Sequence, residues 1–404
     1  MKKKNYPLYE TTKFRDFRVM TEQAATLHGS DTAFSYKKNP NDAEVVKISF
    51  DQARNDIRDF GTECIAMGLR DKKCAIIGTG SVGWIYSYFA LMSVGAVTVP
   101  IDKELPAADM ASIIERAGCS AIFYGAEIGG KLDYLKANTK AEIYVCINGE
   151  QPTKDGAAAD LTAADLIARG DEKFAAGDNS YYDYEIDPDR LASIVFTSGT
   201  TGTSKGVMLS HDNLLECVRA SANMVNFSSR DVLLSVLPLH HTYETCCGML
   251  TPICLGATVC INNSLKYVVR NMNIFRPTGM ILVPLFVSTI YKKICDEVRK
   301  KGKEKLLARG IAATKLARKV GIDLRKPVFA EVRRGLGGRL SKIICGGAAL
   351  DPDLVDRFDE LGIQIAQGYG ITECAPMVST NGNQYCKMGS VGLVMEHYQV
   401  KTVE

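Results

Sequence analysis

The stretch from Cys74 to Ile101 contains no charged residue, and it is the feature that most restricts the fold of this chain. It is long enough to cross a membrane, but five glycine and proline residues interrupt it: Gly78, Gly80, Gly83, Gly95 and Pro100. We therefore interpret it as a buried strand at 74–77, a helix at 84–92 and a second strand at 97–99. Such a βαβ unit predicts an open α/β sheet.

Gly78 to Gly83 also match the Gly-x-Gly-x-x-Gly pattern of dinucleotide-binding proteins. Asp102 follows about twenty residues later, where such proteins place an acid that binds ribose. One alternative function is therefore a nicotinamide- or flavin-dependent oxidoreductase whose cofactor pyrophosphate rests on the helix that starts near Ser81. The other interpretation is structural, because glycine and serine are common in tight turns between a strand and a helix.

Strand and helix patterns continue to alternate along the chain and predict a second α/β region after a polar connection at 148–189. In the first half we expect a helix at 107–117 and strands at 121–124 and 143–147. In the second half Ser210 is expected to cap a helix, and Asp351-Pro352 another. The strands expected there are 191–196, 206–209, 232–236, 258–261, 279–283, 343–345 and 363–366.

The net charge excludes little, because 49 basic and 46 acidic residues leave only +3, and nothing in it indicates a nucleic-acid partner. One segment differs: Tyr291 to Arg339 contains 16 Lys or Arg against 5 Asp or Glu. We expect it to be helical, with Ile290, Ile294 and Val298 on the buried face. Its charges are interpreted as a solvated helix face, and contact with a membrane surface or an anionic ligand is the alternative.

The thirteen cysteines are spread from Cys64 to Cys386 without a Cys-x-x-Cys spacing. Their odd number and spacing favour reduced thiols over a disulfide framework. The three lysines after Met1 are followed by further charges instead of an apolar run, so we expect no export signal. These features predict a cytoplasmic protein, with peripheral membrane contact through 291–339 as the alternative.

The segment from Thr197 to Gly206 concentrates hydroxyl groups, glycines and one lysine between two predicted strands. Glycines let backbone N–H groups turn toward an anion, hydroxyls donate further hydrogen bonds, and Lys205 adds a positive charge. The spacing is not that of a Walker loop. A flexible linker is the alternative. We predict a polyphosphate-binding loop whose ligands come from Thr197, Ser198, Gly199, Thr200, Thr201, Gly202 and Lys205.

The stretch Phe196 to Val207 closely resembles the signature loop of the adenylate-forming, or AMP-binding, enzymes. Four further stretches match that family in order: a substrate-side motif at 237–244, an adenine-side turn at 346–348, a nucleotide and metal motif at 367–373 and a later marker at 389–392. The chain is most similar to the large N-terminal domain of the long-chain fatty acyl-CoA synthetases. The resemblance covers essentially the whole chain. It implies two Rossmann-like open-sheet subdomains at about 1–186 and 187–388, with 389–404 beginning a further β-rich part.

On the nucleotide side, the strand pattern predicts that Gly346 and Gly368 end neighbouring parallel strands, an edge where ligands bind. Tyr369 can stack on a purine, Thr372 can bond the α-phosphate, and Glu373 can hold Mg²⁺. By resemblance, Thr197 also holds the metal. The resemblance implies ATP or AMP contacts for Gly346, Gly347, Ala348, Gln367, Gly368, Tyr369, Gly370 and Thr372.

On the acid side, the resemblance implies substrate contacts for His240, His241 and Tyr243, with His241 near the acyl carboxylate. The adjacent histidines could suggest zinc, but no further ligand is spaced to complete a site. A packed histidine is the other interpretation of His241. An apolar acyl tunnel or ordinary core packing accounts equally well for Met249, Ile281, Val283, Leu285 and Phe286.

The resemblance implies an enzyme that uses ATP and Mg²⁺ to convert a medium- or long-chain fatty acid to acyl-AMP and then transfers the acyl group to coenzyme A. Lys205, Thr372, Glu373 and His241 are the catalytic residues it implies. No Asp lies between Ser235 and Leu250. Peptide-synthetase domains of this family carry an Asp there to hold an amino group, so the resemblance disfavours an amino-acid substrate. An acyl carrier protein as acceptor and an aryl acid as substrate are alternatives. The family continues past Glu404 with a ribose-binding Asp, a hinge and a small C-terminal domain, so we expect little or no thioester formation by this chain alone.

Overall fold

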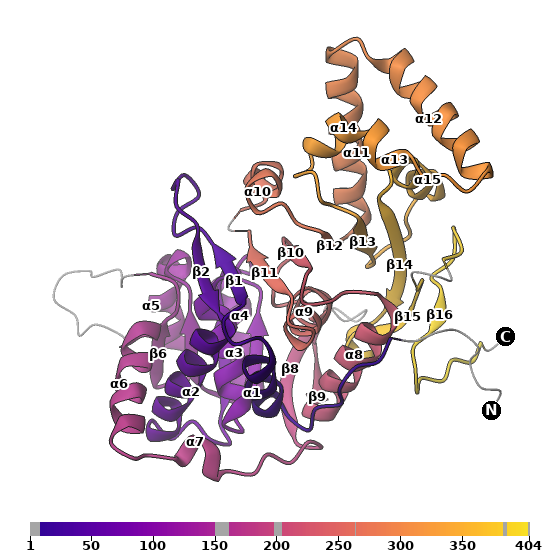
Figure 1. Cartoon of the computed structure of the whole chain (residues 1–404). Helices are drawn as coiled ribbons and strands as arrows, with labels where there is room; N and C mark the ends of the chain where they lie inside the picture. Colours follow the sequence, from indigo (N-terminus) through magenta and orange to yellow (C-terminus); the bar gives the residue numbers. More distant parts are fainter. Residues whose placement is uncertain (1–8, 150–160, 198–203, 263, 383–385, 403–404) are drawn as a thin grey trace.

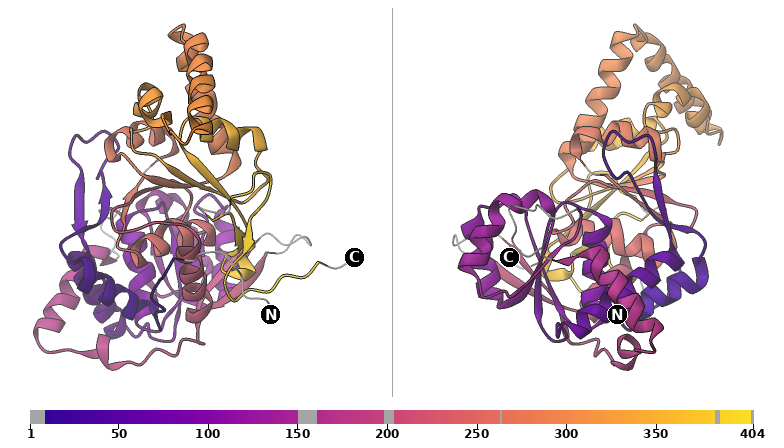
Figure 2. Two further views of the ribbon diagram at one scale, coloured as in Figure 1. Left: turned by 45° about the vertical axis from the view of Figure 1, so that its right-hand side comes forward. Right: turned by 90° about the vertical axis from the view of Figure 1, so that its left-hand side faces the viewer.

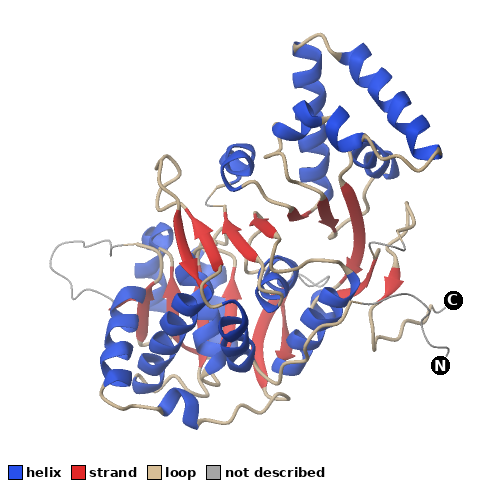
Figure 3. Ribbon diagram, viewed as in Figure 1, coloured by secondary structure: helices blue, strands red, loops and turns tan. Residues whose placement is uncertain are grey.

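The computed structural model describes residues 9–149, 161–197, 204–262, 264–382 and 386–402, and it contains two sheets flanked by helices (Figures 1 and 3). The seven-stranded sheet is parallel except for its last strand. Its strand order is β7(Leu161–Thr162), β6(Ile143–Cys146), β5(Cys119–Tyr124), β3(Lys73–Ile77), β4(Val97–Ile101), β8(Leu191–Thr197) and β9(Lys205–Ser210).

The nine-stranded sheet is parallel at its centre and antiparallel at both edges. Its strand order is β16(Leu393–Val394), β15(Met377–Thr380), β14(Gln364–Gly370), β13(Lys342–Cys345), β12(Gly279–Leu282), β10(Val232–Ser235), β11(Thr258–Ile261), β1(Thr32–Tyr36) and β2(Val46–Ser49). The α/β fold class predicted from the sequence is confirmed.

Helices cover both faces of the seven-stranded sheet. α1(Phe17–His28), α2(Phe50–Ala66), α3(Val82–Ser93) and α8(His211–Met224) bury their apolar faces in one core cluster, and α4(Ala107–Ala117) and α5(Gly129–Asn138) bury theirs in another. The remaining short helices are α7(Ser180–Asp183), α9(Thr251–Cys254), α10(Val268–Phe275), η1(Ala126–Ile128), η3(Leu265–Tyr267), η4(Thr372–Cys374) and the π-helix η2(Glu244–Leu250).

The predicted βαβ unit is present as β3, α3 and β4, and Ser210 caps α8 through a reciprocal capping box with Asn213. Asp351 likewise caps α15(Pro352–Glu360). All thirteen cysteines are free thiols, and most are buried. These features depend on local patterns, so the sequence predicts them well.

The expectation of a surface connection at 148–189 is wrong for residues 161–183, which contain β7, α6(Ala163–Ala175) and α7. α6 packs so closely on α2 that a Cβ on Gly170 would lie 1.7 Å from the carbonyl oxygen of Asp59. Only Leu166 and Gly170 of α6 are buried. The helix is nevertheless amphipathic and begins at a Thr162–Asp165 capping box, so the sequence carries signals for it that the expectation of a surface connection overlooks.

The sheets do not divide the chain at residue 186 or 187. β8 and β9 follow that position but complete the seven-stranded sheet, whereas β1 and β2 precede it and pair with β11 of the nine-stranded sheet. β16, in the segment expected to begin a further β-rich part, pairs with β15 at the edge of the nine-stranded sheet. The subdomain boundary near residue 186 remains a prediction. Strand pairing crosses this boundary in both directions.

The basic segment forms a helical projection from α11(Pro284–Lys300), α12(Glu304–Lys319), α13(Arg325–Val328) and α14(Ala330–Arg334). Figure 2 shows α11 and α12 extending away from the two sheets. Ile290, Ile294 and Val298 are buried, which confirms the predicted helical face. Among the described residues, no helix has the length and apolar character that a membrane crossing requires.

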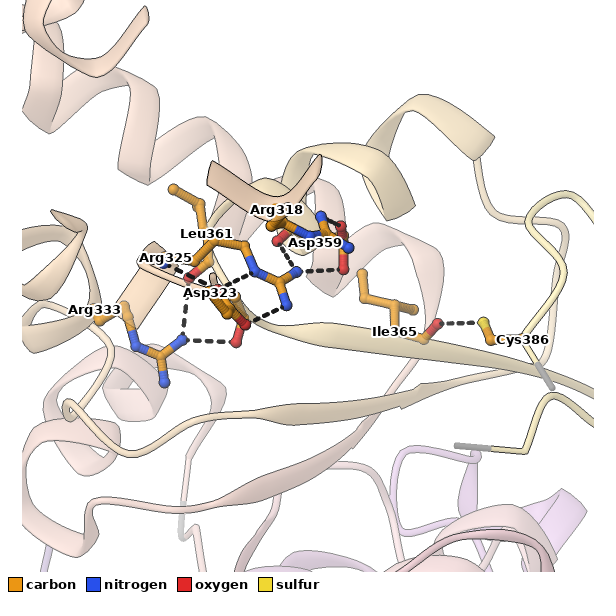
Figure 4. Close-up of polar contacts among 9 residues, drawn as sticks. Arg318, Asp323, Arg325, Arg333, Asp359, Leu361, Ile365 and Cys386 are labelled. Atoms are coloured by element: carbon orange, nitrogen blue, oxygen red, sulfur yellow. Dashed lines mark hydrogen bonds and ion pairs between the residues drawn. The ribbon is translucent and has the colours of Figure 1, made fainter. Parts of the chain in front are cut away.

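Several positive charges of this projection are neutralised within the protein (Figure 4). Arg318 and Arg325 each form an ion pair with Asp359 of α15 at 2.7 Å, and Arg325 also pairs with Asp323 at 2.8 Å. The buried guanidinium of Arg333 donates to the carbonyl oxygens of Gly362 at 3.0 Å and Leu340 at 2.8 Å. The segment is therefore only partly the solvated face that we expect from the sequence.

Candidate functional site

The predicted phosphate loop is framed by two antiparallel strands. Ser198, Gly199, Thr200, Thr201 and Gly202 lie outside the described residues. At the two ends of the loop, Thr197 of β8 and Lys205 of β9 are paired in register. Lys205 is exposed and forms no ion pair with any residue that the structure describes.

Arg116 fixes the C-terminal end of this loop, a role that the sequence analysis missed. Its guanidinium donates to the hydroxyl of Ser204 at 3.1 Å and to the carbonyl oxygen of the same residue at 2.7 Å. Arg116 lies on α4, far from the loop in sequence, and nothing in the local pattern around it indicates this contact.

β14 carries Gln367, Gly368, Tyr369 and Gly370. Its parallel pairing with β13 ends at Gln367 opposite Cys345, directly before Gly368 and Gly346 as predicted, but the strand itself extends to Gly370. The chain continues because β15 pairs antiparallel with this part of β14. A side chain on Gly370 would meet the carbonyl oxygen of Pro376 at 2.1 Å. Tyr369 pairs with Ser379 of β15 through its backbone and is 51% exposed, so its ring is accessible for stacking. The side-chain nitrogen of Gln367 is buried without a hydrogen-bond partner in the described structure.

Thr372 and Glu373 lie in η4, directly after β14, and η4 lies beside β9. This places Glu373 near the strand that begins with Lys205. Its carboxylate is exposed and lines a cavity of about 340 Å³ together with Asp212, Glu216 and Tyr398. Within the described parts of the chain, no three His, Cys, Asp or Glu side chains are grouped to hold a metal ion.

The predicted adenine-side turn follows β13. Gly346 is buried against the ring of Tyr243, where a Cβ would lie 3.1 Å from that ring. Gly347 has φ +82°, a conformation that glycine adopts without strain, and both Gly347 and Ala348 are exposed. The hydroxyl of Tyr243 donates to the carbonyl oxygen of Ile344 in β13 at 3.1 Å. Tyr243 thus joins the substrate-side motif to this turn.

The histidine pair lies where β4 and β10 end. The rings of His240 and His241 are 4.1 Å apart, and Nε2 of His240 is 3.9 Å from Oδ2 of Asp102. Burial lowers the pKa of His240 to about 4, and it lowers that of the more exposed His241 as well, although Asp102 opposes the shift. Both imidazoles are therefore neutral near pH 7. The sequence analysis singled out Asp102 for a different role, as a ribose ligand.

The glycine turn at 78–83 is a packing element. A Cβ on Gly83 would lie 1.6 Å from the carbonyl oxygen of Ile147, and one on Gly80 would lie 3.4 Å from Leu239 of the substrate-side motif. The backbone N–H of Thr79 donates to the carboxylate of Glu127. The carboxylate of Glu127 accepts from the N–H group that a pyrophosphate would need, and its negative charge would repel a pyrophosphate. Both points argue against the dinucleotide interpretation.

None of the five candidate tunnel residues lines either of the two cavities described for this part of the chain. Met249 and Ile281 are buried in the core cluster that contains α3, whereas Leu285 is 73% exposed. A cavity of about 650 Å³ lies instead within the projection, between α11, α12 and α14. Val283 and Phe286 are partly buried and do not line it.

Comparison with known proteins gives a family match over nearly the whole chain. The model of the "AMP-binding enzyme" family matches residues 21–404. The peroxisomal long chain acyl-CoA synthetase 6 of Arabidopsis thaliana is 29% identical over 80% of this chain and 47% of its own length. The chloroplastic long-chain-fatty-acid–[acyl-carrier-protein] ligase AEE15 of the same plant is 26% identical over 89% of this chain and 56% of its own length. This chain therefore spans about half the length of the curated relatives it matches.

A solved structure of a long-chain-fatty-acid-CoA ligase from Archaeoglobus fulgidus superposes with a TM-score of 0.73. It covers 97% of this chain and 71% of that protein, at 19% sequence identity. At this identity, the likeness establishes the fold.

Proposed function

The chain belongs to the family of AMP-binding enzymes, and on that premise we propose that it is the nucleotide- and acid-binding part of a ligase that activates a carboxylic acid with ATP. The proposed reaction joins the acid to the α-phosphate with loss of pyrophosphate. Such a step depends on charge neutralisation and on in-line positioning more than on covalent chemistry by the protein.

For the nucleotide, we propose that Lys205 and the loop at 197–202 neutralise the β- and γ-phosphates while Thr372 orients the α-phosphate. Tyr369 stacks on the purine, and Gly346, Gly347 and Ala348 leave room at its edge. This arrangement is supported by the exposed ring of Tyr369 and by the proximity of η4 to β9. The unpartnered amide of Gln367 suits a polar ligand at the same edge.

Magnesium fits this arrangement, because Mg²⁺ prefers oxygen ligands and usually takes one or two from the protein and the rest from phosphates and water. Glu373 and Thr197 would be its protein ligands, and Glu373 is exposed. Bound Mg²⁺ supplies charge neutralisation on the phosphates.

For the acid, we propose that the neutral His241, with His240 and Tyr243, forms the side of the site that receives the carboxylate. A fatty acid is the proposed substrate and coenzyme A the proposed acceptor, in line with the names of the relatives that match most of the chain. A carrier protein as acceptor remains the alternative within the family, because one relative carries that name.

The observation that carries the proposal is the double contact of Tyr243. Its hydroxyl donates to the carbonyl oxygen of Ile344 in β13 and its ring covers Gly346, while His241 lies two positions before it in the sequence. Two stretches more than one hundred residues apart in the sequence are therefore in contact, which supports a site where an acid and a nucleotide meet.

Calorimetric titration with Mg-ATP tests the nucleotide assignment. We expect Lys205→Ala to weaken binding about tenfold or more, because a charge-assisted contact contributes about 1.5–3 kcal/mol. Lys319→Ala, which removes an exposed lysine at the end of α12, is the matched control and is expected to bind as the wild type does. Binding of NADH in place of ATP, or equal ATP affinity in both variants, would contradict the proposal.

A second proposal concerns the membrane. Leu316 and Val320, near the end of α12, are 67% and 73% exposed and stand among lysines and arginines, a combination suited to an anionic bilayer surface. We expect the chain to co-sediment with vesicles that contain phosphatidylserine and not with phosphatidylcholine alone. A double variant, Leu316→Ser with Val320→Ser, should reduce that binding. Equal binding by the double variant would refute contact through this helix.

A further inference from the structure

Glu244 is a fully buried carboxyl group that the proposed reaction does not use. It is the first residue of the π-helix η2 and has no exposed surface. The hydroxyl of Ser235 donates to its Oε1 at 2.5 Å, and the backbone N–H groups of Val236 and Leu237 donate to the carboxyl group as well. A side chain on Gly248 would lie 2.7 Å from the carboxyl carbon, so this glycine makes the space that the group fills.

These bonds close a loop that carries the substrate-side motif. Ser235 ends β10 and Glu244 begins η2, and the residues between them include both histidines and Tyr243. Thr245 holds the same loop at a second point, because its hydroxyl donates to the carbonyl oxygens of Leu239 and His241. The base of the loop is therefore fixed from inside, while its tip meets the Gly80 turn through Leu239.

The carboxyl group acts here as a neutral hydrogen-bonding unit. Burial raises the pKa of Glu244 to about 8, although the bonds from Ser235 and the backbone oppose the shift. Its Oε2 has no partner among the described residues. Glutamine has the same shape and one equivalent acceptor, so it can replace the neutral acid, whereas alanine leaves the three donors unpaired.

We propose that Glu244 is a positioning residue for acid activation: it holds the loop so that the histidine pair faces Asp102 and Tyr243 covers the Gly346 turn. The functional part of this inference rests on the function proposed above. The geometric part depends only on the contacts of Glu244, Tyr243 and the histidines, and it can be tested without a ligand.

The test uses the full chain labelled with carbon-13 at Cε1 of its five histidines, three of which lie outside the loop: His28, His211 and His397. We expect Glu244→Ala to shift the signals of His240 and His241 and to leave those three unchanged. Glu244→Gln should restore the wild-type spectrum. Glu63→Ala is the matched control, since Glu63 is also buried but lies on α2 and pairs with Lys173; it should move neither signal of the pair.

Binding measurements on the same proteins test the functional part. A misplaced loop is expected to weaken palmitate binding by about tenfold or more in Glu244→Ala and by less than about twofold in Glu244→Gln. A folded Glu244→Ala variant with unshifted His240 and His241 signals would overturn the positioning role. If the wild type binds neither Mg-ATP nor palmitate, the proposed function fails for this chain, while the histidine spectra still decide the role of Glu244.

Discussion

Two glycine-rich turns at the ends of parallel strands have opposite surroundings. The turn at 78–83 is closed: Ile147 and Leu239 pack against it, and Glu127 takes its N–H at Thr79. The turn at 346–348 is open: the ring of Tyr243 covers Gly346, and the next two residues are exposed. The first turn matches a well-known nucleotide pattern, yet the second is the more exposed of the two.

The difference teaches that a glycine pattern indicates only that some group lies too close to the backbone for a side chain. The surroundings of the turn decide whether that group is the protein's own backbone or a ligand. At the first turn the neighbour is the protein's own backbone. A glutamate also lies near each turn, and the two differ in charge: Glu127 is exposed and ionised, whereas Glu244, beneath the loop that reaches the second turn, is buried and neutral at pH 7.

The sharpest way to break this comparison is to add a methyl group to the closed turn. Gly83→Ala should lower the free energy of unfolding by about 3 kcal/mol or more, because the new Cβ would collide with the Ile147 carbonyl and the backbone must move. Gly80→Ala is the matched control, with an ordinary contact to Leu239 and an expected change within about 0.5 kcal/mol. Urea unfolding measures both, and equal midpoints would refute the packing explanation.

The next largest effect is expected from the pH dependence at Glu244. Its folded pKa of about 8 lies above the ordinary value of 4.5, so the folded protein retains a proton that the unfolded chain releases. The wild type should therefore lose stability as pH rises from about 4.5 to about 8 and level off above that. Thermal unfolding of Glu244→Gln should fall less steeply over this window. Parallel profiles would show that Glu244 titrates normally in the folded protein.

Glu127 is expected to show the opposite dependence, with a smaller amplitude. Burial raises its pKa, but hydrogen bonds from Asn148 and Thr79 outweigh burial, and the net shift is downward. Its stabilising contribution is thus present above pH 4.5 and is lost as the pH falls. Glu127→Gln should cost about 1 kcal/mol at pH 7 and nothing near pH 3 in urea unfolding, discounted for its exposure. A cost that grows as the pH falls would contradict this assignment.

The smallest effect on stability is expected at the open turn. Gly347→Ala introduces a side chain at φ +82° but meets only Val283 at 3.4 Å, so it should cost about 1 kcal/mol. Its effect on Mg-ATP affinity, measured by calorimetry, should exceed its effect on the unfolding midpoint. A large loss of stability with unchanged ATP affinity would make this turn a packing element like the first.

The sequence predicts the elements well and their partners poorly. The β3–α3–β4 unit, the cap at Ser210 and the buried face of α11 depend on residues within a few positions of one another. The contacts of Arg116 with Ser204, and of Asp102 with His240, join residues about ninety or more positions apart, and no periodicity signals them. The sheet to which β8 belongs cannot be read from its own residues, because a strand buried on both faces fits either sheet.

The pairing of β1 in the hairpin of β1 and β2 affects how the protein folds while it is being synthesised. β1 pairs with β11, and the hydroxyl of Thr258 donates to the carbonyl oxygen of Thr32, 226 positions earlier. At ribosomal speeds of about 5–20 residues per second, β1 waits about 10–50 seconds for its neighbour to be synthesised. During that interval its edge, which carries the buried Phe34, is unpaired and open to other chains. β1 is therefore secured only after the 226 positions up to Thr258 have been made, and we expect a nascent chain to need a chaperone during that interval.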